Sequence, residues 1–153
     1  MTLEAWRMVK EKHVATAFSG EGAAKTGGRW NSRGVAVVYT SATRSLAALE
    51  TLVHLNPPVM FHYRIIRIEF DQAWVERLPF AALPSDWKTE PPPLSTRQLG
   101  DAWVRSSRSA ILAAPSVIIP EELNYLLNHA HPDFKKITIS KPAPFTFDPR
   151  LLT

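Results

Sequence analysis

The segment GGRWNSRGVAVVYTS, residues 27–41, places Arg29 and Trp30 between glycines and ends in a β-branched run that carries Tyr39. A surface turn needs neither a guanidinium group nor an indole ring. A guanidinium can hold a phosphate through two parallel hydrogen bonds, and glycine lets the backbone approach a ligand closely. The segment therefore fits a site for a phosphate and a flat heterocycle. A surface arginine with two core aromatic residues explains the same residues equally well.

Glu50 lies in residues 43–55, where apolar side chains cover most of the circumference of a predicted helix. It falls on a narrow stripe of mostly small side chains at helical spacing, which leaves room for a ligand beside the carboxylate. The other members of that stripe are Thr43, Ala47, Thr51 and His54. The stripe is also compatible with a helix face that simply meets water.

Three further polar residues lie in apolar surroundings near the C-terminal third of the chain. Ser116 follows Pro115 in a strand-like run, and Asn124 and Asn128 lie four apart on one face of a predicted helix. A serine can satisfy a β-bulge and an asparagine can end a helix, so structural roles remain open for all three. The five histidines show no metal-ligand spacing and cysteine is absent, so no metal site is expected.

Hydrophobic periodicity and turn residues predict the elements that must position these side chains. Strands separated by loops, with only a few helices, favour an α+β fold with a mixed or antiparallel sheet over a doubly wound one. Residues 1–153 are expected to form a single domain. The prediction comprises helices at 43–55, 95–106 and 120–128; strands at 35–40, 63–70, 110–114 with a continuation at 117–119, 137–140 and 145–147; a short helix or irregular segment at 3–13; and loops at 20–28 and 79–94.

The formal charge of +4 and the pI near 9.6 favour anionic partners. The basic residues are dispersed, which argues against nucleic acid as the direct partner. The N-terminal residues lack the apolar core of a signal peptide, and no apolar run approaches the roughly 20 residues of a membrane-spanning helix. A cytoplasmic protein without membrane contact is therefore expected.

The segment GGRWNSRGVAVVYTS, then LAALE ending at Glu50, then APSVIIPEELNYLLNHAHPDF, closely resembles the RES-domain proteins. That family is named for an arginine, a glutamate and a serine, which match Arg29, Glu50 and Ser116. The resemblance extends to AFSGEGA, LGDAWVRS and FTFDPRL, and so covers nearly the whole chain.

This resemblance implies a fold similar to that of ADP-ribosyltransferases and a role as the toxin of a bacterial toxin–antitoxin pair. It implies that NAD+ is a consumed substrate, so that no cofactor is needed. It also implies an antitoxin with a helix-turn-helix DNA-binding domain that blocks the active site. The chain would then form a hetero-oligomer and meet DNA only through that antitoxin.

On this reading, Glu50, Arg29 and Ser116 are the catalytic residues. Glu50 would stabilise positive charge at the anomeric carbon while the nicotinamide–ribose bond breaks. Arg29 would bind the pyrophosphate or a ribose hydroxyl, and Tyr39 would stack on nicotinamide. Trp30 and Asn128 complete the candidate NAD+ contacts, with Trp30 either in the pocket wall or in the core.

The sequence leaves the acceptor open, because water, phosphate and a protein side chain are all compatible with these residues. The main alternative is therefore a mono-ADP-ribosyltransferase that modifies a cellular protein. An RNA-cleaving toxin that uses His54 or His131 is a second alternative, disfavoured by the dispersed charge. A non-catalytic interaction domain is a third, and it predicts that Glu50→Ala changes nothing in cells.

Overall fold

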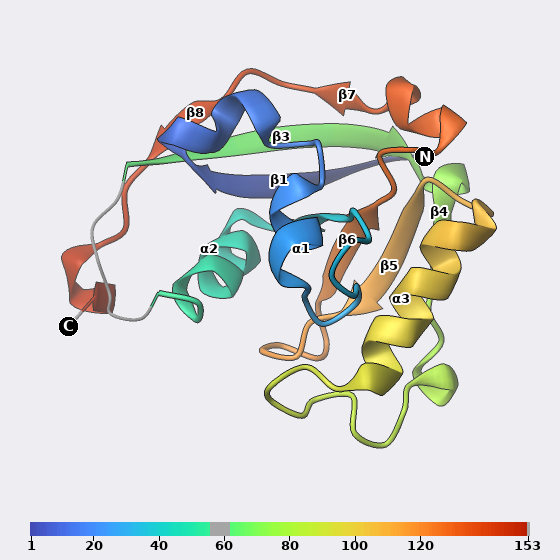
Figure 1. Ribbon diagram of the computed structural model, residues 1–153. Helices are drawn as coiled ribbons and strands as arrows, with labels where there is room; N and C mark the ends of the chain where they lie inside the picture. The colour runs from blue at the N-terminus through green and yellow to red at the C-terminus, as the bar shows by residue number, and fades with distance from the viewer. Residues whose placement is uncertain (56–61, 153) are drawn as a thin grey trace.

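The computed structural model describes residues 1–55 and 62–152. Within them, eight strands form one sheet in the order β4-β5-β6-β2-β1-β3-β7, and β8 also pairs with β3 (Figure 1). Neighbouring strands are antiparallel except β4 and β5, which are parallel. The strands are β1 Thr2–Lys10, β2 Val38–Ser41, β3 Tyr63–Asp71, β4 Val75–Arg77, β5 Ile111–Pro115, β6 Leu123–Leu127, β7 Thr138–Ile139 and β8 Ala143–Phe145.

A small number of helices flank this sheet, so the prediction of an α+β fold with a mixed or antiparallel sheet is confirmed. Helix α3 covers β5 and β6, where Trp103 packs with Leu112 and Leu126 in one buried cluster. Helix α2 packs near β1 and β3, in a cluster that contains Trp6 and Ala47. The α-helices are α1 Glu21–Thr26, α2 Arg44–Leu52 and α3 Leu94–Ser106, and the 3-10 helices are Glu11–Thr16, Gln72–Trp74, Phe80–Ala82, Pro132–Lys136 and Pro149–Leu152.

The N-terminal segment is a strand, and the prediction of a short helix or irregular segment at 3–13 was wrong. β1 lies between β2 and β3 in the sheet, and its residues 5, 6, 8 and 9 are all buried. Burial on both faces removes the alternation by which a strand is recognised. Nine registered residue pairs with β3 decide the conformation instead.

The segment 120–128 is also a strand for most of its length, which corrects the predicted helix. Glu122 N–H donates to the Ile119 carbonyl at 2.9 Å and closes a turn, after which β6 begins. Pro120, Glu121 and Glu122 resemble the start of a helix, but they form only this turn. The apolar run that follows pairs with β2 on one side and β5 on the other, and sheet packing overrides the local preference. Residues 117–119 likewise turn instead of continuing β5.

The glycine-rich residues 20–28 contain helix α1, where a flexible loop was predicted. Gly20 with φ 77° precedes this helix, and Gly27 with φ 72° follows it. Positive φ values of this kind are readily adopted only by glycine. These two glycines therefore mark the ends of the helix and do not prevent it from forming. The chain then enters the segment 28–34 that carries Arg29.

That segment is held tightly against α3. An ideal Cβ on Gly100 would lie 1.6 Å from the Trp30 carbonyl oxygen, so only glycine permits this approach. One residue later in α3, the Asp101 carboxylate accepts hydrogen bonds from the Ser32 N–H at 2.8 Å and from the Ser32 hydroxyl at 2.6 Å. The backbone that directly follows Arg29 is therefore held by α3 at two points.

Candidate active site

Helix α2 carries Glu50 and begins directly after β2. Thr43 is its N-cap residue, and the Thr43 hydroxyl oxygen accepts a hydrogen bond from Leu46 N–H at 3.0 Å. Leu46 and Ala47 are buried, which orients the helix on the sheet. Glu50 follows one turn later and is partly buried. The stripe that contains Glu50 thus meets protein on one side, and does not lie wholly in water.

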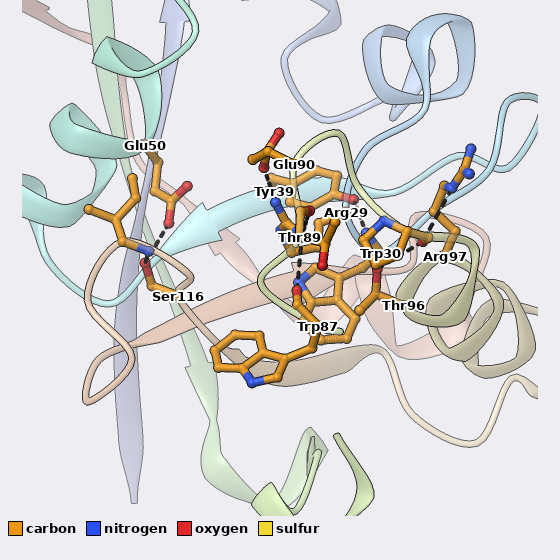
Figure 2. A network of polar contacts seen from close by, with 12 residues as sticks. Arg29, Trp30, Tyr39, Glu50, Trp87, Thr89, Glu90, Thr96, Arg97 and Ser116 are labelled. Atoms are coloured by element: carbon orange, nitrogen blue, oxygen red, sulfur yellow. Dashed lines mark hydrogen bonds and ion pairs between the residues drawn. The ribbon is translucent and has the colours of Figure 1, made fainter. Parts of the chain in front are cut away.

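Two side-chain donors converge on one oxygen of the Glu50 carboxylate, and Figure 2 shows the one from Ser116. The Ser116 hydroxyl donates to Oε1 at 2.7 Å, and the Asn124 amide Nδ2 donates to the same atom at 2.8 Å. Among the described residues, no hydrogen bond to Oε2 is formed. The two donors come from the end of β5 and from β6, so three separate elements meet at this carboxylate.

Ser116 is fully buried, and its hydroxyl direction is set by the backbone that follows it. Its oxygen accepts hydrogen bonds from Ile118 N–H and Ile119 N–H, both at 3.1 Å. With these donors facing the oxygen, the hydroxyl hydrogen is directed at Glu50. The turn at 117–119 that replaces the predicted strand therefore has a local function, because it orients Ser116.

Arg29 is held by the loop that was predicted at 79–94. Its Nη1 donates to the carbonyl oxygens of Trp87 and Thr89, each at 2.9 Å, and its Nη2 forms an ion pair with Glu90. The Arg29 side chain is 11% exposed, whereas that of Glu90 is 68% exposed. Burial lowers the pKa of Arg29, and the nearby Glu50 carboxylate and Tyr39 oppose this shift. Arg29 is therefore both an anchor for the loop and a cation within electrostatic reach of Glu50.

Tyr39 is built into the segment that carries Arg29. Its hydroxyl donates to Asn31 Oδ1 at 2.6 Å and accepts from Trp30 N–H at 3.1 Å. A Cβ on Gly28 would lie 2.8 Å from this hydroxyl, so the glycine makes room for it. Burial raises the pKa of Tyr39, and the hydrogen bond from Trp30 N–H opposes this. The Tyr39 ring is half-buried, and both hydrogen bonds of its hydroxyl are to protein atoms. Stacking of the ring on nicotinamide stays a prediction.

We expect Tyr39→Phe to lower the free energy of unfolding by about 1–3 kcal/mol, since it leaves two polar groups of buried residues without their partner. Urea denaturation measures the effect. Tyr125→Phe is the matched control, because the Tyr125 hydroxyl forms no hydrogen bond with the described residues, and it should lose well under half as much. Equal losses in the two variants would contradict the role given to the Tyr39 hydroxyl.

Two predicted ligand contacts are not brought to this carboxylate. Trp30 is 2% exposed and belongs to the core cluster with Trp103, so it supports the segment from within. Asn128 is also 2% exposed, and its side chain donates to the Val104 carbonyl and accepts from Ala130 N–H. It lies four residues beyond Asn124, or about 13 Å along an extended strand.

Arg7 is a potential site residue that the sequence analysis missed. Its Nε donates to the Ala17 carbonyl at 3.0 Å, and its Nη1 donates to the Tyr39 carbonyl at 3.2 Å. Burial lowers the pKa of Arg7 to about 10, and no carboxylate of the described residues forms an ion pair with it. A charged residue within an apolar strand was the available signal, but the segment was not recognised as a strand.

Other features of the described residues lie apart from the Glu50 carboxylate. An apolar groove of about 420 Å³ lies beside α2 and is lined by residues including Arg44, Ala48 and Phe147, but Glu50 is not among them. His131 accepts a hydrogen bond from Asp133 N–H as the cap of a 3-10 helix. Within the part of the chain that the structure describes, no three His, Asp or Glu side chains gather as a metal ion would require. No helix of residues 1–55 or 62–152 has the length and hydropathy to cross a bilayer.

Comparison with solved structures defines the class of fold. A chain of the crystal structure of the M. tuberculosis MbcT–MbcA toxin–antitoxin complex superposes with a TM-score of 0.77 at 15% identity, covering 95% of this chain and 85% of that chain. At that identity the likeness establishes the fold.

Sequence comparison defines the family. The RES domain model matches residues 4–148, and the chain belongs to the RES domain family. A Prs ADP-ribosylating toxin of Sphingobium sp. (strain YBL2) is 40% identical over 158 residues, which cover 99% of this chain and 98% of that protein. A Toxin Res of Yersinia enterocolitica is 36% identical over 95% of this chain and 97% of its own length, and another of Photorhabdus laumondii is 36% identical over 96% of each. The resemblance on which Arg29, Glu50 and Ser116 were selected is therefore confirmed.

Proposed function

We propose that this chain, as a single RES domain over residues 1–153, is the toxin of a toxin–antitoxin pair and cleaves the nicotinamide–ribose bond of NAD+. The observation that carries the proposal is the Glu50 carboxylate, with Oε1 held by Ser116 and Asn124 and no hydrogen bond from the described residues to Oε2. The names of the toxin relatives support the cellular role.

Cleavage of this bond develops positive charge at the anomeric carbon, which a fixed carboxylate stabilises. At about 4 Å and an effective dielectric constant of about 20, the attraction is roughly 4 kcal/mol, which corresponds to about a thousandfold in rate. Ser116 holds the carboxylate in place, because its hydroxyl is itself fixed by two backbone N–H groups. Such preorganised charge is an effective form of catalysis because it needs no rearrangement during the reaction.

The phosphates of NAD+ need cations, and we assign this role to two arginines that lie beside Tyr39. In the ion pair, the carboxylate of exposed Glu90 occupies a position beside Arg29 that suits an anion. A phosphate group of the substrate would take the place of that carboxylate. Arg7 is the second cation, and it has no carboxylate partner among the described residues. A partly buried guanidinium without a counter-ion is a natural binding group for phosphate.

We expect Arg7→Lys to raise the KM for NAD+ by about tenfold to a hundredfold, since a hydrogen bond to a charged group contributes about 1.5–3 kcal/mol and lysine lacks the planar fork. Steady-state kinetics with the purified protein measures the change. Arg67→Gln is the control, because Arg67 lies on β3 in exposed ion pairs with Glu4 and Glu69. A KM unchanged by Arg7→Lys would remove Arg7 from the substrate site.

Transfer of ADP-ribose to a protein is the second candidate function, and it shares the same bond cleavage. It is favoured by the Sphingobium relative, whose name describes an ADP-ribosylating toxin and which matches 99% of this chain. Water and phosphate are the acceptors in the first candidate. The carboxylate can also deprotonate the acceptor in either reaction, so the site geometry serves both.

Incubation with NAD+ labelled in its adenylate phosphate separates these acceptors. The purified chain is tested alone, with inorganic phosphate, and with a cell extract or the protein Prs, which the name of the Sphingobium relative mentions. Label in free ADP-ribose indicates hydrolysis, label in a phosphate-dependent product indicates phosphorolysis, and label in protein indicates transfer. Intact NAD+ under all of these conditions would contradict the proposed function.

A chain that consumes NAD+ would injure the cell that makes it, so we propose an inhibitory antitoxin as its partner. The cytoplasm, where NAD+ is available, is the expected location. The net charge of +4 would steer an acidic antitoxin surface toward the chain. The helix-turn-helix domain of that antitoxin, and contact with DNA through it, are part of this proposal.

A further inference from the structure

We propose that Ser41 and Asn124 form a positioning pair that fixes the orientation of the Glu50 carboxylate. The inference rests on the proposed function, in which Glu50 acts on the substrate, and it assigns a role to two residues outside the arginine–glutamate–serine set. Ser41 acts through Asn124, and Asn124 acts through Glu50.

The pair is built into the pairing of two strands. Ser41 of β2 and Asn124 of β6 are direct partners in the antiparallel register, so their side chains lie on the same face of the sheet. The Ser41 hydroxyl donates to Asn124 Oδ1 at 2.7 Å, and Asn124 Nδ2 donates to Glu50 Oε1 at 2.8 Å. Ser41 is 4% exposed and Asn124 is 9% exposed.

The direction of these bonds determines how the amide is oriented. Because Oδ1 accepts from Ser41, the Nδ2 group is directed at Glu50. The reverse orientation of the amide would place Oδ1 against the carboxylate, with two acceptors facing each other and no hydrogen between them. The Glu50 carboxylate, which can only accept, therefore selects this orientation of Asn124, and the Ser41 hydroxyl holds the amide in it by donating to Oδ1.

The terminal torsion of a glutamate is broad and weakly restricted by its own rotamers. A single donor leaves the carboxylate free to swing about the bonded oxygen. Two donors on Oε1, Ser116 from the end of β5 and Asn124 from β6, define its plane and present Oε2 to the ligand. A displacement of about 1 Å at a reacting group is enough to lower the rate a hundredfold, so loss of one donor should reduce turnover more than binding.

The same strand pair supplies a matched control. The Thr40 hydroxyl donates to the Tyr125 carbonyl at 2.7 Å and is buried, and Thr40 is the direct partner of Tyr125 in the register next to Ser41 and Asn124. Its side chain lies on the opposite face of the sheet from Ser41. Thr40→Val therefore removes a comparable buried hydrogen bond between β2 and β6 without touching Glu50.

The test compares Ser41→Ala, Thr40→Val, Asn124→Leu and the double variant Ser41→Ala/Asn124→Leu. Steady-state kinetics of NAD+ consumption and growth arrest on induced expression are both measured, with thermal unfolding as the check on folding. We expect Ser41→Ala to lower kcat by about tenfold to a hundredfold with KM changed by less than about threefold. Thr40→Val should keep kcat within about twofold of the wild type despite a similar fall in thermal stability.

The double variant decides whether Ser41 acts through Asn124. If it does, Ser41→Ala adds less than about a twofold effect in the Asn124→Leu background. Equal kinetic losses in Ser41→Ala and Thr40→Val, or a full Ser41→Ala effect in the absence of Asn124, would overturn the proposal. A wild type that arrests growth while NAD+ stays intact would refute the proposed substrate, and the pair would then be judged by the same comparison of growth arrest.

Discussion

Glu50→Gln is expected to reduce NAD+ consumption by about a thousandfold, measured as kcat/KM of the purified protein. The glutamine Oε1 can still accept hydrogen bonds from Ser116 and Asn124, so the substitution removes the charge and leaves the surrounding contacts in place. The effect should therefore appear in kcat and in growth arrest, with little change in the unfolding midpoint.

Glu69→Gln is the control for that substitution. Glu69 is a partly exposed carboxylate on β3 that pairs with Arg67, and its neutralisation should leave NAD+ consumption within about twofold, as expected for a surface ion pair. Comparable activity of Glu50→Gln and the wild type would contradict the assignment of Glu50. So would a large loss that is matched by unfolding of the variant, because the proposal attributes the loss to charge.

Gly100→Ala should lower the free energy of unfolding by at least about 3 kcal/mol, a large effect for one methyl group. The new Cβ would lie 1.6 Å from the Trp30 carbonyl oxygen and 2.5 Å from its carbonyl carbon. Both are backbone atoms, so no side-chain rotation can relieve the clash. Helix α3 must then move away from the segment 28–34, and the bonds between Asp101 and Ser32 are lost with it. Chemical denaturation of the purified variant measures the change.

Gly22→Ala makes the same chemical change where there is space for it. A Cβ on Gly22 meets nothing within 4 Å, and the residue lies inside helix α1, where alanine is favoured over glycine by up to about 1 kcal/mol. This variant should be as stable as the wild type or slightly more stable. A Gly100→Ala protein of wild-type stability would show that α3 and the Arg29 segment are not in the contact described.

The fold could be predicted in part because some elements carry their own signals. Helix α2 has a Thr43 cap and an apolar surface, and β3 alternates strongly, so both were predicted close to their observed bounds. β1 and β6 were not predicted, because central strands are buried on both faces and are defined by their neighbours. Local signals in these segments are weak or point to a helix.

The candidate site shows the same division. Glu50 and Ser116 were paired through the family resemblance, and the structure places them in direct contact 66 residues apart in sequence. The role of Asn124 depends on its lying in a strand opposite Ser41. Because residues 120–128 were predicted to be a helix, this pairing could not be predicted. The contact of Arg29 with residues 87–90 is set by a long loop whose path has no periodic signal.

Release of nicotinamide from NAD+ by the purified chain is the most direct test of the central claim. With NAD+ labelled in the nicotinamide ring, the wild type is predicted to release one nicotinamide for each NAD+ lost, whichever acceptor takes the ADP-ribose. Glu50→Gln should release almost none. Protein that arrests growth when expressed, but leaves labelled NAD+ intact in the presence of water, phosphate and candidate protein acceptors, would contradict the claim.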